Sequence, residues 1–298
     1  HIEGDIMYGR GTADMKGSIA AFLDSLDEFF LSSPDLNFRI AVLLTSNEEG
    51  DSSDGFIDKI VNDMIDADEK IDLCLVGEPT SYLKIGDSVR IGRRGSLGGS
   101  LKVLGKQGHI AYPENVNNPI FSASDAIVEL KNTVWDNGNA IFQPTSFQIS
   151  NIHSGTGAKN VVPGELEMFF NFRYSTESSQ ETLIDEFEAI LKKLNIEYEI
   201  DWKLSGLPYL TEKDNLKDVV VQSVQKITGY SPDLNAKGGT SDGRFIAKMG
   251  TEIVELGPLN ETIHQIDEHI KISELRVLKD IYTDILEGLN RKLKNNLS

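Results

Sequence analysis

Carboxylate side chains recur in three places where a strand or turn ends. Asp14 follows a Gly-Arg-Gly turn, Glu48 and Glu49 follow the apolar run 40–44, and Glu78 follows the apolar run 73–76. Loops beyond the carboxyl ends of strands converge at one edge of an α/β sheet. Carboxylates gathered there repel one another unless a cation lies between them, because burying a bare carboxylate is costly. The pattern predicts a divalent-metal site, and a histidine ligand would favour zinc.

Each of these acids also has a simpler interpretation. Asp14 fits the N-cap of the helix that is expected to follow it. Glu48 and Glu49 fit a solvated pair in a loop, and Glu78 precedes Pro79, as a turn residue often does. Residue types and spacing alone leave these alternatives open.

The elements that would position the acids alternate between helix and strand. Apolar residues at helical spacing predict a helix over 15–30, and continuous apolar runs predict strands buried on both faces. The further expectations are strands at 40–44, 73–76 and 253–256 and helices near 55–65, 216–227 and 273–293. We therefore predict an α/β domain, formed by residues 1–94 and 209–298, with helices on both faces of a mixed sheet.

The pattern changes between these two parts. Strands are expected near 97–103, 147–152, 166–172 and 198–204, and helices over 119–130 and 183–194. Residues 166–172 alternate between apolar and polar, which is typical of a strand with one buried face. The order β-α-β-β-α-β predicts a ferredoxin-like α+β domain over residues 95–208, inserted into the first domain.

Several motifs resemble those of a known family. Residues 8–17, Y-G-R-G-T-A-D-M-K-G, closely resemble the signature of the M20 metallopeptidase family. The segments E-E-G at 48–50 and G-E-P at 77–79 resemble its other metal-binding segments. Further similar segments lie at 93–97, 108–113, 160–164, 238–245 and 257–264. The last two resemble the branch that acts on N-succinyl-diaminopimelate more than the branch that deacetylates acetylornithine. The resemblance extends over about 5–289.

The resemblance implies a pair of zinc ions. Asp14 would bridge both, Glu78 would bind the first, and Glu49 and His264 would complete the second. Glu48 would be the general base and acid. The family carries a further ligand in an upstream His-x-Asp segment that does not occur in this sequence. We therefore expect one ion or none in this chain and two in a protomer with that segment, with Co²⁺ as a possible substitute.

The resemblance also implies a homodimer formed through the inserted domain. His109 would reach the active site of the neighbouring subunit and donate a hydrogen bond to the oxyanion; its alternative is an ordinary surface histidine. Residues in the family's substrate-binding motifs are Arg93, Arg94, Tyr112, Asn160, Arg173 and Thr240. Guanidinium groups suit the carboxylates of such a substrate. For Arg173 a structural salt bridge is an equal alternative.

The activity implied is hydrolysis of N-succinyl-LL-2,6-diaminopimelate to succinate and LL-2,6-diaminopimelate, a step of lysine and diaminopimelate biosynthesis. Two alternatives within the family are an acetylornithine deacetylase and a dipeptidase. An alternative of another class is an inactive, truncated dimer that only binds carboxylate ligands.

Composition excludes some partners. The formal net charge of -18 over 298 residues argues against nucleic acid, which needs clustered Lys and Arg. No apolar run approaches the roughly 18 residues of a membrane span, so no membrane partner is expected. Cys74 is the one cysteine, so no internal disulfide can form, which fits a reducing compartment. We expect a cytoplasmic protein.

Overall fold

The computed structural model describes residues 1–32, 35–36, 38–45, 56–239 and 241–296. Its internal contacts divide the chain into two compact units. The first comprises His1–Arg93, Leu210–Ala236 and Ser241–Ser298, and the second comprises Arg94–Tyr209 and Lys237–Thr240.

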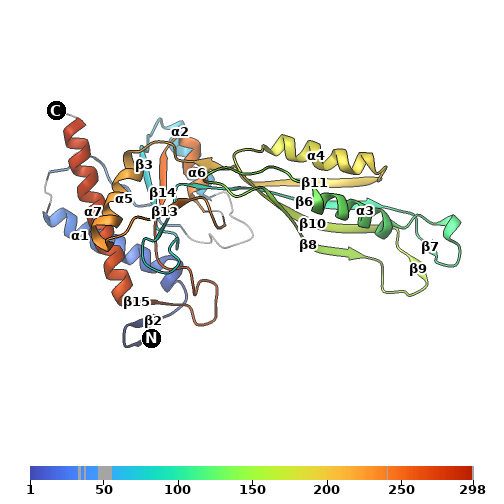
Figure 1. Cartoon of the computed structure of the whole chain (residues 1–298), viewed down its shortest axis with the longest axis horizontal. Coiled ribbons are helices and arrows are strands. Elements are labelled where there is room, and N and C mark those ends of the chain that lie inside the picture. The colour runs from blue at the N-terminus through green and yellow to red at the C-terminus, as the bar shows by residue number, and fades with distance from the viewer. Residues whose placement is uncertain (33–34, 37, 46–55, 240, 297–298) are drawn as a thin grey trace. The chain divides into compact units, whose positions relative to one another are not determined.

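The first unit is built on a mixed four-stranded sheet. The strand order is β13-β4-β14-β3, in which β14 runs parallel to β3 and antiparallel to β4, while β13 runs parallel to β4. The strands are β3 (Leu73–Val76), β4 (Ser88–Arg90), β13 (Asp233–Asn235) and β14 (Glu252–Glu255). Every residue of β14 is buried, because α5 (Asn215–Thr228) and α7 (Ile272–Asn296) lie on one side of the sheet and α6 (Gly243–Ile246) lies on the other (Figure 1). The predicted mixed α/β fold is confirmed.

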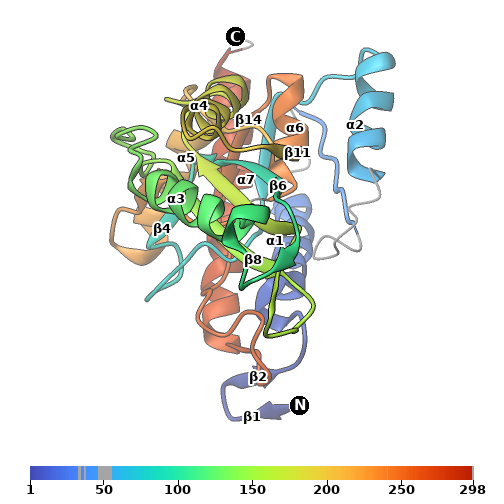
Figure 2. The same cartoon turned by 90° about the vertical axis from the view of Figure 1, so that its right-hand side faces the viewer.

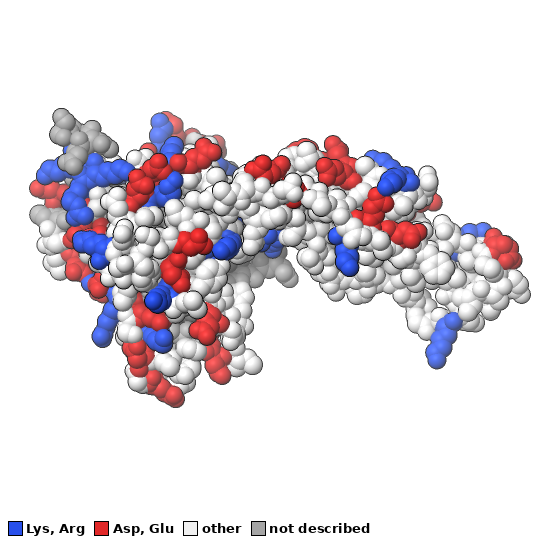
Figure 3. Space-filling view, viewed as in Figure 1, with Lys and Arg blue, Asp and Glu red and all other residues white. Residues whose placement is uncertain are grey.

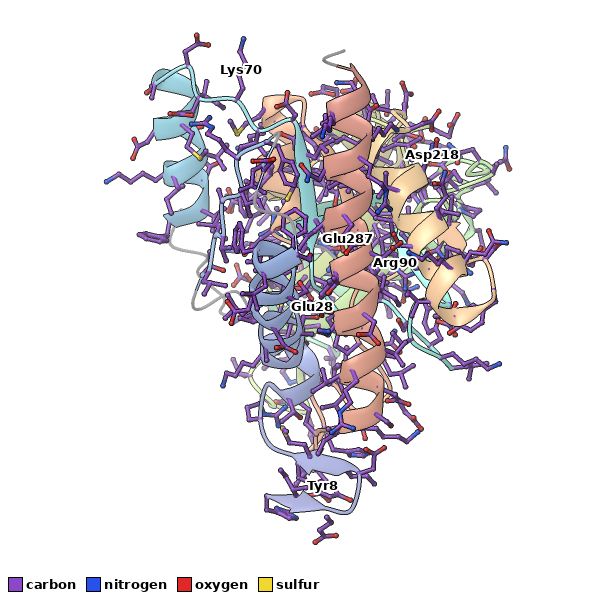
Figure 4. All side chains as sticks on the ribbon, turned by 90° about the vertical axis from the view of Figure 1, so that its left-hand side faces the viewer. Tyr8, Glu28, Lys70, Arg90, Asp218 and Glu287 are labelled. Carbon is purple, nitrogen blue, oxygen red and sulfur yellow. The ribbon has the colours of Figure 1, made fainter. Side chains whose placement is uncertain are left out.

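Three long helices pack together beside this sheet. They are α1 (Gly17–Ser32), α5 (Asn215–Thr228) and α7 (Ile272–Asn296). Figure 4 shows α7 between the other two. An ion pair between Glu28 of α1 and Lys279 of α7 adds to the apolar contacts of this layer. The smaller helical elements are the π-helical turn Thr12–Lys16, α2 (Phe56–Asp66), α6 (Gly243–Ile246) and the 3-10 turn Ala247–Met249.

A small antiparallel sheet joins the start of the chain to a late segment. It has the order β1-β2-β15, with β1 (Ile2–Glu3), β2 (Ile6–Tyr8) and β15 (His269–Lys271). Tyr8 pairs with His269 in its register. This pairing places the Gly-Arg-Gly turn next to the segment that precedes β15.

One expected strand is absent from the described chain. Residues 40–44 form no strand, and Val42, Leu43 and Leu44 are each about half exposed, at 46%, 48% and 56%. An apolar run becomes a buried strand only where a neighbouring strand supplies the hydrogen-bonding partners. Among the described strands of this sheet, β3 pairs with β14 and none pairs with 40–44.

The second unit has the predicted β-α-β-β-α-β order. Its strands are β6 (Gly95–Leu104), β8 (Ser146–Ser154), β10 (Glu165–Tyr174) and β11 (Tyr198–Gly206), which form an antiparallel sheet in the order β11-β6-β10-β8. Helices α3 (Pro119–Asn132) and α4 (Gln180–Lys193) lie side by side on one face (Figure 2). A short 3-10 turn, Pro113–Asn115, precedes α3.

The core of the second unit is aromatic. Phe170 stacks on Phe187 with ring centroids 4.7 Å apart, and Trp202 meets both rings edge-on. Glycines on β6 make room for the rings: a Cβ on Gly99 would lie 2.5 Å from the Phe170 ring. Glycines weaken a strand, but on β6 they leave the space that the aromatic rings fill.

In the described ranges, no helix combines the length and apolar character of a membrane span. On the face drawn in Figure 3, lysine and arginine are interspersed with acidic residues rather than gathered into one patch.

Candidate functional site

The structure brings together two of the predicted metal ligands. His264 Nε2 lies 3.1 Å from Asp14 Oδ2, although 250 residues separate them in sequence. The Asp14 side chain is 12% exposed and the His264 side chain 62% exposed, so the pair opens to solvent on the histidine side. A carboxylate and an imidazole are both zinc ligands, and this spacing suits two ligands of one ion as well as a hydrogen bond. These two residues therefore fit a divalent metal.

A tight turn holds Asp14 ahead of α1. Gly11 adopts a positive φ of 84°, and the backbone N–H of Lys16 donates to the Gly11 carbonyl at 2.7 Å. A Cβ on Gly17 would lie 2.3 Å from the Thr12 carbonyl oxygen. Only glycine fits there without moving the turn, which explains part of the motif around Asp14.

Glu78 lies at the end of β3, on a segment packed against α1. The hydroxyl of Ser18 donates to the Gly77 carbonyl at 2.5 Å, and a Cβ on Gly77 would lie 2.9 Å from the side chain of Met15. The backbone after β14 lies against the Gly77-Glu78 segment, since a Cβ on Gly257 would lie 2.3 Å from the Glu78 carbonyl oxygen. The Gly77-Glu78 segment thus lies beside the segment that follows Asp14.

Three of the predicted site residues lie outside the described residues: the metal ligand Glu49, the base Glu48 and the substrate-binding residue Thr240. Within the described ranges, no group of three His, Cys, Asp or Glu side chains is close enough together to hold an ion. Asp14 and His264 are therefore the part of the predicted centre that the described chain assembles.

A buried carboxylate that sequence reasoning did not single out lies beside this pair. Glu268 is 2% exposed, and its carboxylate accepts from the backbone N–H groups of Gly11, Ala13 and Asp14, each at 3.0 Å, and from Arg10 at 2.9 Å. Burial raises the pKa of Glu268, but these donors outweigh it and hold the pKa below its usual value. The one available signal was an acid four residues after His264.

Three candidate residues of the second unit lie close to one another. His109 on β7 (Gly108–His109) pairs with Val161 on β9 (Val161–Val162), and the N–H of Ile110 donates to the Asn160 carbonyl at 3.2 Å. The ring of Tyr112 lies 5.8 Å from that of His109, centroid to centroid. His109 and Tyr112 are both exposed. This exposed strand pair brings His109, Tyr112 and Asn160 to one place.

Two of the candidate arginines, Arg94 and Arg173, are close enough for their charges to interact. Burial lowers the pKa of Arg94, and the positive charge of Arg173 lowers it further. The Nε of Arg94 is buried and has no hydrogen-bond partner in the described chain. Two neighbouring guanidinium groups favour an anion such as a carboxylate.

Arg93 has different surroundings. It forms a buried ion pair with Glu255 on β14, and the Ser241 hydroxyl donates to the other oxygen of that carboxylate at 2.5 Å. With 8% of its side chain exposed, Arg93 is bound within the core of the first unit. Its predicted contact with substrate stays a prediction.

Comparison with known proteins gives one matching family. The sequence model described as peptidase family M20/M25/M40 matches residues 1–288. Two curated relatives are named succinyl-diaminopimelate desuccinylase. The one from Methylococcus capsulatus is 51% identical over 283 residues, which are 95% of this chain and 75% of that protein. The one from Stutzerimonas stutzeri is 52% identical over 287 residues, 96% of this chain and 75% of that protein.

Solved structures share the fold at low sequence identity. The aminopeptidase PepT from Bacillus cereus has a TM-score of 0.79 at 19% identity, covering 97% of this chain and 75% of that one. An M20 family metallo-carboxypeptidase from Sulfolobus solfataricus has a TM-score of 0.75 at 18% identity, covering 98% of this chain and 79% of that one.

Proposed function

The chain belongs to the peptidase family M20/M25/M40, and we propose that it hydrolyses N-succinyl-LL-2,6-diaminopimelate to succinate and LL-2,6-diaminopimelate. The observation that carries the proposal is the identity of 51–52% to proteins named succinyl-diaminopimelate desuccinylase, over at least 95% of this chain. The 3.1 Å approach of His264 to Asp14 supports it from the structure.

Membership of this family implies a divalent metal, and we propose zinc. Asp14, Glu49, Glu78 and His264 would hold it, with two ions in a protomer that also carries the upstream ligand, and with Co²⁺ as a substitute. When bound, zinc polarises an amide carbonyl and lowers the pKa of water to about 7.

The protein's own residues would move the proton and stabilise charge. Glu48 takes the proton from the attacking water and delivers it to the departing amine nitrogen, as the new C–O bond forms and the amide C–N bond breaks. His109 donates a hydrogen bond to the oxyanion of the tetrahedral intermediate. Arg94 and Arg173 bind a substrate carboxylate, which the lowering of the Arg94 pKa by burial and by the charge of Arg173 supports. Arg93, Tyr112, Asn160 and Thr240 complete the proposed substrate contacts.

The two parts of the chain would divide this work. Residues 1–94 and 209–298 would form the metal-binding domain, and 95–208 the domain through which two copies associate. In the homodimer His109 serves the site of the other subunit. The exposure of His109 on its short strand pair supports a role toward a second molecule.

Comparing substrates tests the proposal. Initial rates are measured with N-succinyl-LL-diaminopimelate, N-acetylornithine and a dipeptide, after chelation and again after zinc or cobalt is added back. Zinc per protomer is measured for this chain and for a longer chain that carries the upstream His-x-Asp segment. We expect metal-dependent release of succinate. Faster hydrolysis of N-acetylornithine or the dipeptide would assign another activity of the family, and no zinc and no hydrolysis in either chain would leave only the carboxylate-binding scaffold.

A further inference from the structure

Glu268 ties together the two segments that carry Asp14 and His264. On one side its carboxylate accepts from three backbone N–H groups of the turn 9–14, at 3.0 Å each. On the other side it belongs to the same loop as His264. The backbone adds a further bond, from the N–H of Gly9 to the Glu268 carbonyl at 2.9 Å.

Arg10 connects the same two segments a second time. Its Nη1 donates to the Glu268 carboxylate at 2.9 Å, and its Nη2 donates to the Gln265 carbonyl at 2.8 Å. Gln265 directly follows His264, so the hydrogen bond from Arg10 to Gln265 helps to position the backbone next to His264. His264 itself has a positive φ of 60°, which is uncommon for a non-glycine residue and requires support from its surroundings.

The bonds at Glu268 also determine what the Asp14 carboxylate can do. Without Glu268, the N–H groups of Gly11 and Ala13 would lack acceptors, and aspartate side chains readily accept from nearby backbone N–H groups. Glu268 occupies these donors, and the Asp14 carboxylate contacts His264, 3.1 Å away. Since its own oxygens accept from four donors, Glu268 orients a ligand rather than acting as one.

We propose that Glu268, assisted by Arg10, is a positioning residue that sets the relative geometry of Asp14 and His264 before a cation binds. The inference rests on the proposed function, because it assigns the role to the metal centre of that activity. This role predicts that the hydrogen bonds of Glu268 and Arg10 form in the metal-free protein. It also predicts that their loss reduces the free energy of metal binding more than the free energy of unfolding.

The test compares Glu268→Gln with Asp267→Asn, the matched loss of a neighbouring, exposed acid. Zinc affinity of the chelator-stripped proteins is measured by competition with a chromophoric chelator. Losing a residue that supports a metal ligand typically weakens affinity 10- to 100-fold, and we expect a loss of that order for Glu268→Gln and none for Asp267→Asn. Amide hydrogen exchange of the metal-free proteins should show faster exchange over residues 9–14 in Glu268→Gln alone.

Arg10→Ala provides a second variant that should fold normally, because the Arg10 side chain is 63% exposed. We expect its zinc affinity to fall toward the lower end of the same range, about 10-fold. Near-UV circular dichroism establishes that each protein is folded when its affinity is measured. A purely structural role would lower the unfolding temperature and leave the affinity of the folded protein unchanged.

The outcomes separate the two ideas. If the wild-type chain binds zinc and Glu268→Gln binds it equally well, the positioning role is wrong and the proposed function stands. If neither the wild-type chain nor its upstream-extended form binds zinc, both ideas are wrong. Weaker binding by Glu268→Gln and Arg10→Ala, with Asp267→Asn unchanged, supports the positioning role.

Discussion

At the scale of single residues, the Asp14–His264 pair depends on residues that bind no ligand themselves. Gly11 and Gly17 shape the turn around Asp14. The Glu268 carboxylate accepts hydrogen bonds from backbone N–H groups of that turn. A metal ligand is held by such neighbours as much as by its own rotamer. Substitutions that remove these bonds should therefore weaken metal binding.

A residue-scale prediction concerns His109. His109→Ala should lower kcat by about 100-fold or more, because the proposed oxyanion donor is lost, while bound zinc stays unchanged. Steady-state kinetics and metal analysis of the same sample measure both quantities. His153→Ala, at another exposed histidine of the same unit, is the control and should retain full turnover. Unchanged turnover in His109→Ala would remove this residue from the mechanism.

At the scale of elements, the ends of β3 and β14 meet with no room for a side chain. Gly257→Ala would place a methyl group 2.3 Å from the Glu78 carbonyl oxygen and 2.4 Å from that of Gly77. The backbone must move, which we expect to cost about 1–3 kcal/mol of unfolding free energy and to weaken zinc binding by displacing Glu78.

Denaturant unfolding and zinc titration measure the two effects of Gly257→Ala. Gly164→Ala is the matched control, since its methyl group would meet Gln107 at an ordinary 3.5 Å. Equal zinc affinity in Gly257→Ala and the wild type would show that this contact does not position Glu78.

A second element-scale prediction concerns the loop before β8. Burial raises the pKa of Asp136, but the Thr145 hydroxyl and N–H, the Ser178 hydroxyl and the Gly138 N–H lower it more, to about 2. Asp136→Asn cannot accept all of these bonds and should lose about 2–3 kcal/mol of unfolding free energy near neutral pH. Asp201→Asn, at an exposed position, should lose almost none.

The sign of the pH dependence follows from the lowered pKa. The folded pKa of about 2 lies below the usual value of 3.8, so the carboxylate contributes its full stability above the usual value. That contribution is lost as the pH falls through 3.8 toward 2. The difference in unfolding free energy between the wild type and Asp136→Asn, measured from pH 6 to pH 2.5, should shrink over this range. A constant difference would contradict the assignment.

At the scale of the whole molecule, the proposed homodimer predicts complementation between subunits. His109→Ala and Glu48→Gln should each retain at most about one hundredth of wild-type activity alone. If His109 acts on the other subunit, a mixed dimer has one complete site of two, and random exchange makes half the dimers mixed, so about a quarter of wild-type activity should return. Rates before and after subunit exchange measure this. No recovery, in a mixture shown by mass spectrometry to have exchanged, would contradict the shared site.

Local patterns in the sequence were enough to predict most of the elements. The expected helices 15–30 and 119–130 correspond to α1 and α3, and the alternating residues 166–172 lie within β10. Periodicity succeeds there because one face of each element is buried against the rest of its unit. The motif resemblance identified the family, since the spacing of its glycines and acids reflects backbone constraints at each turn.

The tertiary structure alone decided which segments pair as strands and which side chains have hydrogen-bond partners. The run 40–44 has the composition of a buried strand, but no described strand pairs with it, and pairing is not encoded in the run itself. Glu268 looked like one of many acids until folding placed it against three backbone N–H groups of a turn more than 250 residues away. Hydrogen bonds between residues far apart in the sequence depend on the tertiary fold, so the local spacing of residues does not predict them.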